Sequence, residues 1–194
     1  MACRAGCASS FCAVSRGHEG GMAALRRFLA RRPGAVQALT AGALMGAGDV
    51  IAQQLVEQRG LRGHHSQRTL KMTAIGFCFV GPVVGGWYRI LDRLIPGATK
   101  TVAVKKMVLD QGAFAPCFLG CFLAITGAVN GLSVEQNWAK IQQDYVDALL
   151  TNYCIWPPVQ IANFYFVPLA HRLAVVQCVA IVWNCYLSWK ANRL

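Results

Sequence analysis

One carboxylate interrupts an otherwise apolar stretch of the chain. Asp49 lies inside residues 35–56, and Gln53 follows one helical turn later on the same face. A charge in the middle of a membrane span costs at least ~2.5–3.5 kcal/mol, so Asp49 needs water, a cation or hydrogen-bond partners. Two kinds of site fit this requirement: an aqueous path for solutes, or a closed polar network that pairs Asp49 with a cation such as Arg89. Both interpretations stay open at this point.

Polar residues also accompany the other apolar stretches. Arg89 with Asp92, and Asp110, stand at the expected membrane edges, while Gln160 and Asn163 interrupt residues 148–170. Intramembrane polar groups are expensive and often functional. The candidates for a pore lining or a buried polar network are Asp49, Gln53, Arg89, Asp92, Asp110, Gln160 and Asn163.

The sequence offers no pattern typical of an enzyme or a metal site. It has no G-x-S-x-G, H-E-x-x-H or P-loop motif. His64 and His65 are neighbours without acidic or thiol partners, and the nine cysteines include no C-x-x-C pair. Cys117 and Cys121 share a helix face, where packing is favoured over a redox role. We therefore expect no enzymatic activity, no metal and no other cofactor.

The composition indicates the kind of element that must position these residues. Of 194 residues, 55% are hydrophobic and only 14% are charged, against about 25% charged in soluble domains. This excludes a disordered chain and a large multidomain enzyme. We predict an all-α, polytopic membrane helical bundle in contact with the lipid bilayer. Its four transmembrane helices are expected at about 35–56, 72–91, 111–132 and 148–170. The apolar run 173–189 is a fifth span or a C-terminal helix lying on the bundle.

The N-terminal region differs from the rest. Residues 1–21 are rich in Gly, Ser and Ala and are predicted to be a disordered extension, with Met22 as an alternative start. Residues 22–34 form a basic amphipathic flank of the kind found in mitochondrial targeting segments, although a plain basic flank would look similar. Residues 35–194 are predicted to be a single integral membrane domain.

The formal net charge of +11 is interpreted as a topology signal. With four spans, the side that holds both termini and the second connector carries eleven cations, against five on the other side. The positive-inside rule then places both termini in the matrix if the membrane is the mitochondrial inner one. Direct nucleic-acid binding is not expected, because no basic stripe is interleaved with aromatic residues in a soluble segment.

Small residues recur at four-residue spacing, which favours close contact between membrane helices. We expect packing within the chain, with a homo-oligomer as the alternative. The residues concerned are Gly42, Gly46, Gly81, Gly85, Gly127 and Gly131.

The C-terminal third carries a distinctive set of residues. They are Trp156, Pro157, Asn163, Phe164, Pro168, Arg172, Trp183 and Asn184. With Gly48-Asp49, Gly81-Pro82 and Trp87-Tyr88, this set resembles the signature of the Mpv-seventeen / peroxisomal membrane protein twenty-two family. The resemblance runs from about Arg26 to the C-terminus, and residues 81–88 are most similar to the member after which the family is named.

The resemblance implies a mitochondrial inner-membrane channel of low selectivity for small solutes. It also implies effects on membrane potential, reactive-oxygen homeostasis, the deoxynucleotide pool and mitochondrial DNA maintenance, so that the solutes would include deoxynucleotides or their precursors. A peroxisomal membrane is the alternative location, and a non-conducting structural or assembly protein is the alternative function.

Overall fold

The computed structural model describes residues 33–97, 99–168 and 171–193. The predicted N-terminal extension 1–21, and the basic flank up to residue 32, lie outside this part of the chain. The described residues contain helices and no strands, which confirms the all-α prediction.

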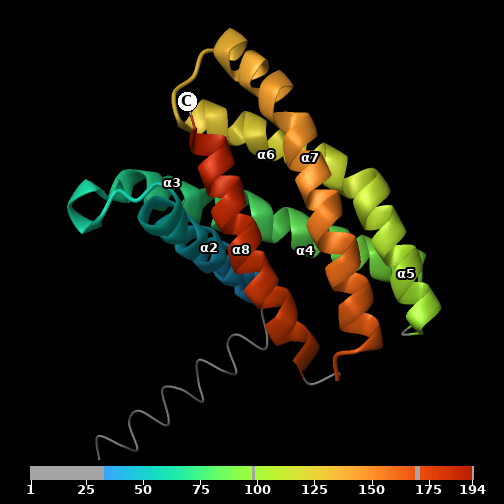
Figure 1. Cartoon of the computed structure of the whole chain (residues 1–194). Helices are drawn as coiled ribbons and strands as arrows, with labels where there is room; N and C mark the ends of the chain where they lie inside the picture. The colour runs from blue at the N-terminus through green and yellow to red at the C-terminus, as the bar shows by residue number, and fades with distance from the viewer. Residues whose placement is uncertain (1–32, 98, 169–170, 194) are drawn as a thin grey trace, which may run out of the picture.

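Five helical rods follow one another along the described chain (Figure 1). The first is α2 (Pro33–Ile51), which continues into the π-helical turn η1 (Ala52–Val56). A short 3-10 turn, η2 (Leu61–Gly63), leads to the second rod. The second rod is α3 (Ser66–Ile75), η3 (Gly76–Val80) and α4 (Gly81–Leu94); the third is α5 (Lys100–Leu109), η4 (Asp110–Phe114) and α6 (Ala115–Val129). The fourth and fifth rods are α7 (Val134–Tyr165) and α8 (Arg172–Asn192).

Three described rods are long and apolar enough to cross a membrane: Gly34–Val56, Ser66–Leu94 and Lys100–Val129. They contain the first two predicted spans and most of the third, which was predicted to end at residue 132 but ends at Val129. The second and third rods begin earlier than predicted, inside the segments that separate the predicted spans. The predicted fourth span, 148–170, overlaps the second half of α7, whose first half lies between the third and fourth predicted spans. The full count of four or five spans stays a prediction.

The rods alternate in direction, so that the bundle has two ends (Figure 1). The network end, as we call it, holds the η1–α3 connector, the α6–α7 turn and the C-terminal end of α8. At this end Asn130 Nδ2 donates to Asn192 Oδ1 at 2.9 Å. The cavity end holds the first residues of α2, α5 and α8 and the last residues of α4 and α7. Helix α8 runs beside α2, and α6 packs against α7.

This arrangement corrects the assumption behind the predicted orientation. The start of α2 and the end of α8 lie at opposite ends of the bundle, because the described chain forms five rods that alternate in direction. Lys190 and Arg193 therefore move to the network end. The predicted balance of eleven cations against five becomes nine against seven. The positive-inside argument no longer places both termini on one side.

Two π-helical turns each end two residues before a proline. Pro82 and Pro116 lack the N–H that an α-helix needs, and the ring of each would clash with the carbonyl four residues earlier. Those carbonyls belong to Cys78 and Gly112, inside η3 and η4 respectively. The wider π turn makes room for each proline ring without ending the rod. Such turns are frequent at functional sites.

Several predicted packing glycines lie between α2 and the second rod. A Cβ atom on Gly46 would lie 2.5 Å from Thr73 Oγ1, and one on Gly81 would lie 2.4 Å from Ala38 Cα. Gly42 and Gly85 face Phe77 and Gln37 less tightly, at 3.2 Å. These contacts are within the chain.

The last predicted glycine pair separates. Gly127 contacts Asn137 of α7, where an added Cβ would meet the Asn137 side chain. Gly131 instead occupies the α6–α7 turn with a φ of 83°, a conformation that favours glycine. Gly131 is therefore a turn residue rather than a helix-packing residue.

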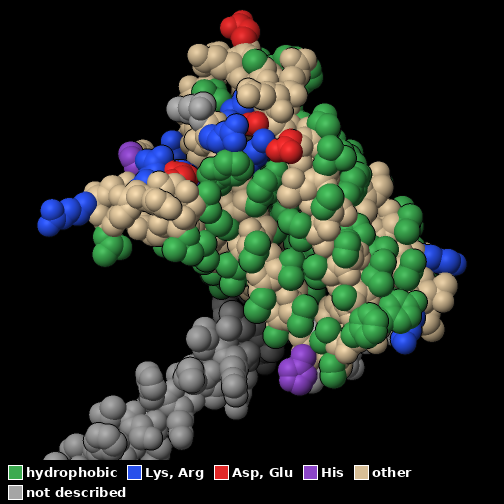
Figure 2. Space-filling view, in the orientation of Figure 1, with side chains coloured by type: hydrophobic (Ala, Val, Ile, Leu, Met, Phe, Trp, Pro, Cys, Tyr) green, Lys and Arg blue, Asp and Glu red, His purple; other side chains and the backbone are tan. Residues whose placement is uncertain are grey.

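An apolar core fills the middle of the bundle. Met45, Leu119, Phe122 and Leu187 are almost completely buried there. The lateral face seen in Figure 2 is mostly hydrophobic, and the charged side chains gather toward its ends. Such a distribution suits a protein surrounded by lipid between two aqueous phases.

Candidate functional site: a closed polar network and an open polar cavity

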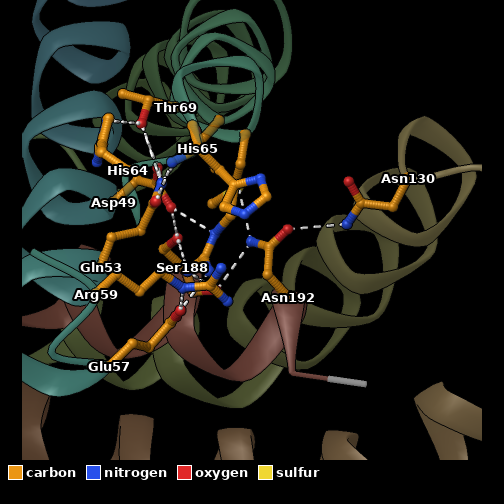
Figure 3. A network of polar contacts seen from close by, with 12 residues as sticks. Asp49, Gln53, Glu57, Arg59, His64, His65, Thr69, Asn130, Ser188 and Asn192 are labelled. Atoms are coloured by element: carbon orange, nitrogen blue, oxygen red, sulfur yellow. Dashed lines mark hydrogen bonds and ion pairs between the residues drawn. The ribbon is translucent and has the colours of Figure 1, made fainter. Parts of the chain in front are cut away.

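Asp49 is the centre of a closed polar network at the network end (Figure 3). Its side chain is fully buried and accepts hydrogen bonds from Gln53 Nε2 at 2.8 Å, Thr69 Oγ1 at 2.6 Å and Ser188 Oγ at 2.5 Å. Arg68 Nε lies 2.8 Å from Asp49 Oδ1. The partners come from η1, α3 and α8, so that one carboxylate joins three segments of the chain.

Arg68 connects this carboxylate to a second one. Its Nη1 atom lies 2.7 Å from Glu57 Oε1, and its Nη2 atom donates to the carbonyl and hydroxyl oxygens of Ser188 at 3.3 and 3.2 Å. A planar guanidinium presents several donors in a fixed fork, which suits it to bridging two acidic groups. The sequence analysis offered Arg89 as the cation for Asp49; the structure assigns Arg68 to that position.

Gln53 uses both ends of its amide inside the same network. Its Nε2 atom donates to Asp49 and to the His65 carbonyl, and its Oε1 atom accepts from the His65 backbone N–H at 2.7 Å. Gln53 is fully buried. Asp49 and Gln53 thus take part in a closed network, which corresponds to the second of the two interpretations left open by the sequence.

The second polar region is a cavity of about 400 Å³ on the cavity-end side of the apolar core. Its size falls within the range of small-molecule sites. Its lining combines aromatic rings with uncharged polar side chains and includes one carboxylate, Asp110. The polar lining residues are Gln37, Thr40, Tyr88, Asp110, Gln111, Asn152, Gln160, Gln177 and Asn184.

A short chain of hydrogen bonds holds Asp110 in the cavity wall. Trp87 Nε1 donates to Asp110 Oδ1 at 2.8 Å, and Gln111 Nε2 donates to Oδ2 at 3.0 Å. Asn152 Nδ2 of α7 donates in turn to Gln111 Oε1 at 2.6 Å. These donors are uncharged. Within the described ranges, no Lys, Arg or His forms an ion pair with Asp110.

The π turn η4 explains why this part of the wall depends on α7. In η4 the Ala115 N–H donates five residues back, to the Asp110 carbonyl. The next donor in that register would be residue 116, which is proline and has no N–H. The Gln111 carbonyl instead accepts from Tyr153 Oη at 3.0 Å. A side chain of α7 thus replaces a main-chain donor.

The remaining predicted residues are distributed over the molecule. Gln160 lines the cavity. Arg89 and Asp92 are exposed on α4, and Asp92 pairs with Lys106 at 2.6 Å. Asn163 is buried in α7, outside the cavity lining.

The residues that carried the family resemblance are also placed by the structure. Trp156, Trp183 and Asn184 line the cavity, whereas Pro157 lies inside α7. Phe164 belongs to the last turn of α7, Pro168 follows that helix and Arg172 begins α8. No group of three or more His, Cys, Asp or Glu in the described part of the chain is arranged to hold a metal ion.

Sequence reasoning missed several members of both regions. Arg68 and Thr69 were assigned to a polar connector, and their contacts with Asp49 depend on how α3 meets α2. The contacts of Trp87 and Tyr153 are likewise tertiary. One signal was present: Pro116 lies five residues after Gln111, and a proline inside a helical pattern leaves earlier carbonyls without a donor.

Comparison with known proteins relates the chain to a group of membrane proteins. The model of the Mpv17 / PMP22 family matches residues 127–188. Mitochondrial inner membrane protein Mpv17 of Xenopus laevis is 69% identical over 170 residues, which cover 88% of this chain and 96% of that protein. The Homo sapiens protein of the same name is 68% identical over 171 residues, covering 88% and 97%. Protein sym-1 of Neurospora crassa is 44% identical over 163 residues, covering 83% and 93%. No solved structure matches the chain.

Proposed function

Because the chain belongs to the Mpv17 / PMP22 family, we propose that it is a channel of low selectivity for small solutes in the mitochondrial inner membrane. The names of its relatives support this membrane rather than the peroxisomal one. We also propose that the protein has no enzymatic activity. Effects on membrane potential, reactive-oxygen homeostasis, the deoxynucleotide pool and mitochondrial DNA maintenance would follow from solute passage.

The single observation that carries the channel proposal is the polar cavity. It lies inside a bundle in which three of the described rods are long and apolar enough to span a membrane, and it is lined by nine polar residues. Polar surface is costly in the hydrocarbon region unless it serves a protein interior or a water-filled path. A cavity of about 400 Å³ holds many waters or one small organic solute.

Conduction requires a change in the structure described above. The cavity lining includes Met45, Leu119 and Phe122, which belong to the apolar core, and the Asp49 network lies beyond them. An open pathway would need α8 to move away from α2 and α3, which breaks the bonds of Ser188. We propose that the described conformation is the closed one.

We also propose that the start of α2 faces the matrix. The cavity end, together with the arginines that precede α2, still carries the larger number of cations. Cysteine labelling in mitoplasts from the two sides tests this orientation.

The closed network supports a second candidate function. Asp49, Arg68 and Ser188 join the helices α2, α3 and α8 to one another. A non-conducting structural or assembly protein of the inner membrane would use the bundle in this way, with the cavity filled by water.

Purified protein in a planar bilayer distinguishes the two functions. We expect wild-type protein to conduct small ions with weak selectivity, and Asp110→Asn to shift its cation-to-anion permeability ratio. Asp92→Asn, which removes an exposed carboxylate outside the cavity, is the matched control. Absence of conductance from folded wild-type protein would contradict the channel proposal and favour the structural one.

A further inference from the structure

We propose that the cavity is a binding site for a small organic cation, with Asp110 as its anionic partner. This inference rests on the proposed function only for its role in transport, because binding in the cavity can be measured separately. It assigns a charge class to the solute, which neither the family nor the relatives' names provide.

The first observation is a carboxylate without a cationic partner among the described residues. Asp110 is held by Trp87 Nε1 and Gln111 Nε2, both uncharged donors. Asp49, a fully buried carboxylate of the same bundle, has a guanidinium 2.8 Å away. Burying a charge away from water is expensive unless an opposite charge accompanies it. A bound cation would supply Asp110 with the opposite charge that Arg68 supplies to Asp49.

The second observation is the chemical character of the rest of the wall. The rings of Tyr88, Phe114 and Trp156 line the same cavity as Asp110. Aromatic faces attract organic ammonium groups, most strongly where water is excluded. Carboxylate and rings together suit an ammonium group on a small apolar body.

The charge of the wall opposes phosphorylated solutes. A phosphate group near Asp110 would place two anions in a medium of low dielectric constant, where their repulsion is strong. The remaining polar lining of the described cavity consists of amides and hydroxyls, such as Gln160 and Thr40. These groups form hydrogen bonds with ligands but do not neutralise a phosphate. The cavity wall as described therefore selects cations over nucleotides, so that an effect on the deoxynucleotide pool would follow from the passage of cationic or uncharged solutes rather than of the nucleotides themselves.

The test is a binding measurement on purified full-length protein in detergent. Choline is the cationic probe, 3,3-dimethylbutan-1-ol is its neutral counterpart of similar shape, and thymidine monophosphate is the anionic probe. Trp156 and Trp183 line the cavity, so intrinsic tryptophan fluorescence reports occupancy. We expect choline to bind at least about tenfold more tightly than the neutral alcohol, equivalent to about 1.4 kcal/mol.

Two variants locate the charge effect. Asp110→Asn keeps the acceptor for Trp87 and should remove the preference for choline. Asp92→Asn lies outside the cavity and should preserve it. Equal binding of choline and the alcohol, tighter binding of thymidine monophosphate, or no choline binding at all would overturn the inference.

A second measurement does not depend on the stability of Asp110→Asn. Thr40→Cys places a thiol in the cavity lining, and mass spectrometry of its peptide gives the rate of modification by cationic and anionic methanethiosulfonate reagents. We expect the cationic reagent to react at least about tenfold faster after correction for intrinsic reactivity, a difference of about 1.4 kcal/mol in the barrier. Equal rates would overturn the inference. Choline binding without any bilayer conductance would retain the site and remove the channel.

Discussion

Asp49 and Asp110 are two carboxylates of one bundle, and their surroundings differ in every respect that matters for function. Asp49 is fully buried, ion-paired with Arg68 and bonded to residues of three segments. Asp110 lines a cavity and is supported by neutral donors. The Asp49 carboxylate is occupied by partners within the protein, whereas the Asp110 carboxylate faces a cavity that a solute could enter.

The largest expected effect comes from neutralising the closed carboxylate. Asp49→Asn leaves Arg68 buried beside Glu57 alone, and removing one partner of a buried ion pair typically costs about 3–5 kcal/mol. Asp110→Asn, the matched change in the cavity, leaves no described cation without its partner. We expect it to shift stability by less than about 1 kcal/mol. Thermal unfolding of both variants in the same detergent measures the contrast, and equal losses would contradict it.

The next effect concerns the packing that keeps the network closed. A Cβ atom on Gly48 would lie 2.7 Å from the backbone carbon of Asn184, so Gly48→Ala should push α8 away from α2. Overpacking of this kind typically costs about 1–3 kcal/mol. Gly112 stands near Asp110 in η4 with open space around it, and Gly112→Ala is the control. If the two substitutions reduce the melting temperature equally, the result would contradict the close contact between α2 and α8 at Gly48.

A smaller effect should mark the cavity side. Tyr153→Phe removes the donor to the Gln111 carbonyl, and a partly buried carbonyl left without a partner costs roughly 1 kcal/mol. Tyr165→Phe, at an exposed position of the same helix, controls for loss of a hydroxyl. We expect only Tyr153→Phe to lower stability and to alter the fluorescence of the cavity tryptophans. An unchanged melting temperature would show that water replaces the hydroxyl.

The sequence was sufficient to predict the helices that carry these two regions, but it did not predict which side chains contact one another across those helices. The first three spans follow from apolar runs, because the hydrocarbon core sets their length. The second rod nevertheless starts at Ser66, before the apolar run. Arg68 and Thr69 in its first turns contact Asp49, so these polar side chains have partners inside the bundle. Composition alone assigns such residues to a connector. The partnership of Asp49 with Ser188 joins residues far apart in the chain, which no local pattern encodes.

The difference between the two carboxylates was equally inaccessible to pattern analysis. Both Asp49 and Asp110 were candidates for the same path, and both are followed by a glutamine within one turn. They differ because α8 brings Ser188 to Asp49, whereas α7 brings Asn152 to Gln111 beside Asp110. Pro116 gave a partial signal, because a free carbonyl at Gln111 requires a donor from another helix.

The smallest expected effect is a pH dependence at a third carboxylate, on the exposed surface of the network end. Asp147 accepts from Lys190 Nζ at 2.6 Å. This hydrogen bond and the charge of Lys190 lower the Asp147 pKa from its ordinary value of 3.8. A carboxylate with a depressed folded pKa stabilises the protein fully above its unfolded pKa, and the contribution disappears as pH falls through the folded value. The contact therefore matters at neutral pH and is lost only in acid.

Asp147→Asn tests this contact against the buried one. We expect a slightly lower melting temperature than wild type at about pH 6, with the difference shrinking as the pH falls below the ordinary pKa of 3.8 and the wild-type carboxylate becomes protonated. In a Lys190→Met background the same substitution should show a smaller pH-dependent difference, because the group that lowers the Asp147 pKa most is absent and only the weaker effects of Tyr186 and Arg193 remain. Exposed pairs contribute little, since solvent screens them. A penalty at Asp147 as large as that at Asp49 would mean that helix attachment at this end depends on the surface pair rather than on the buried network.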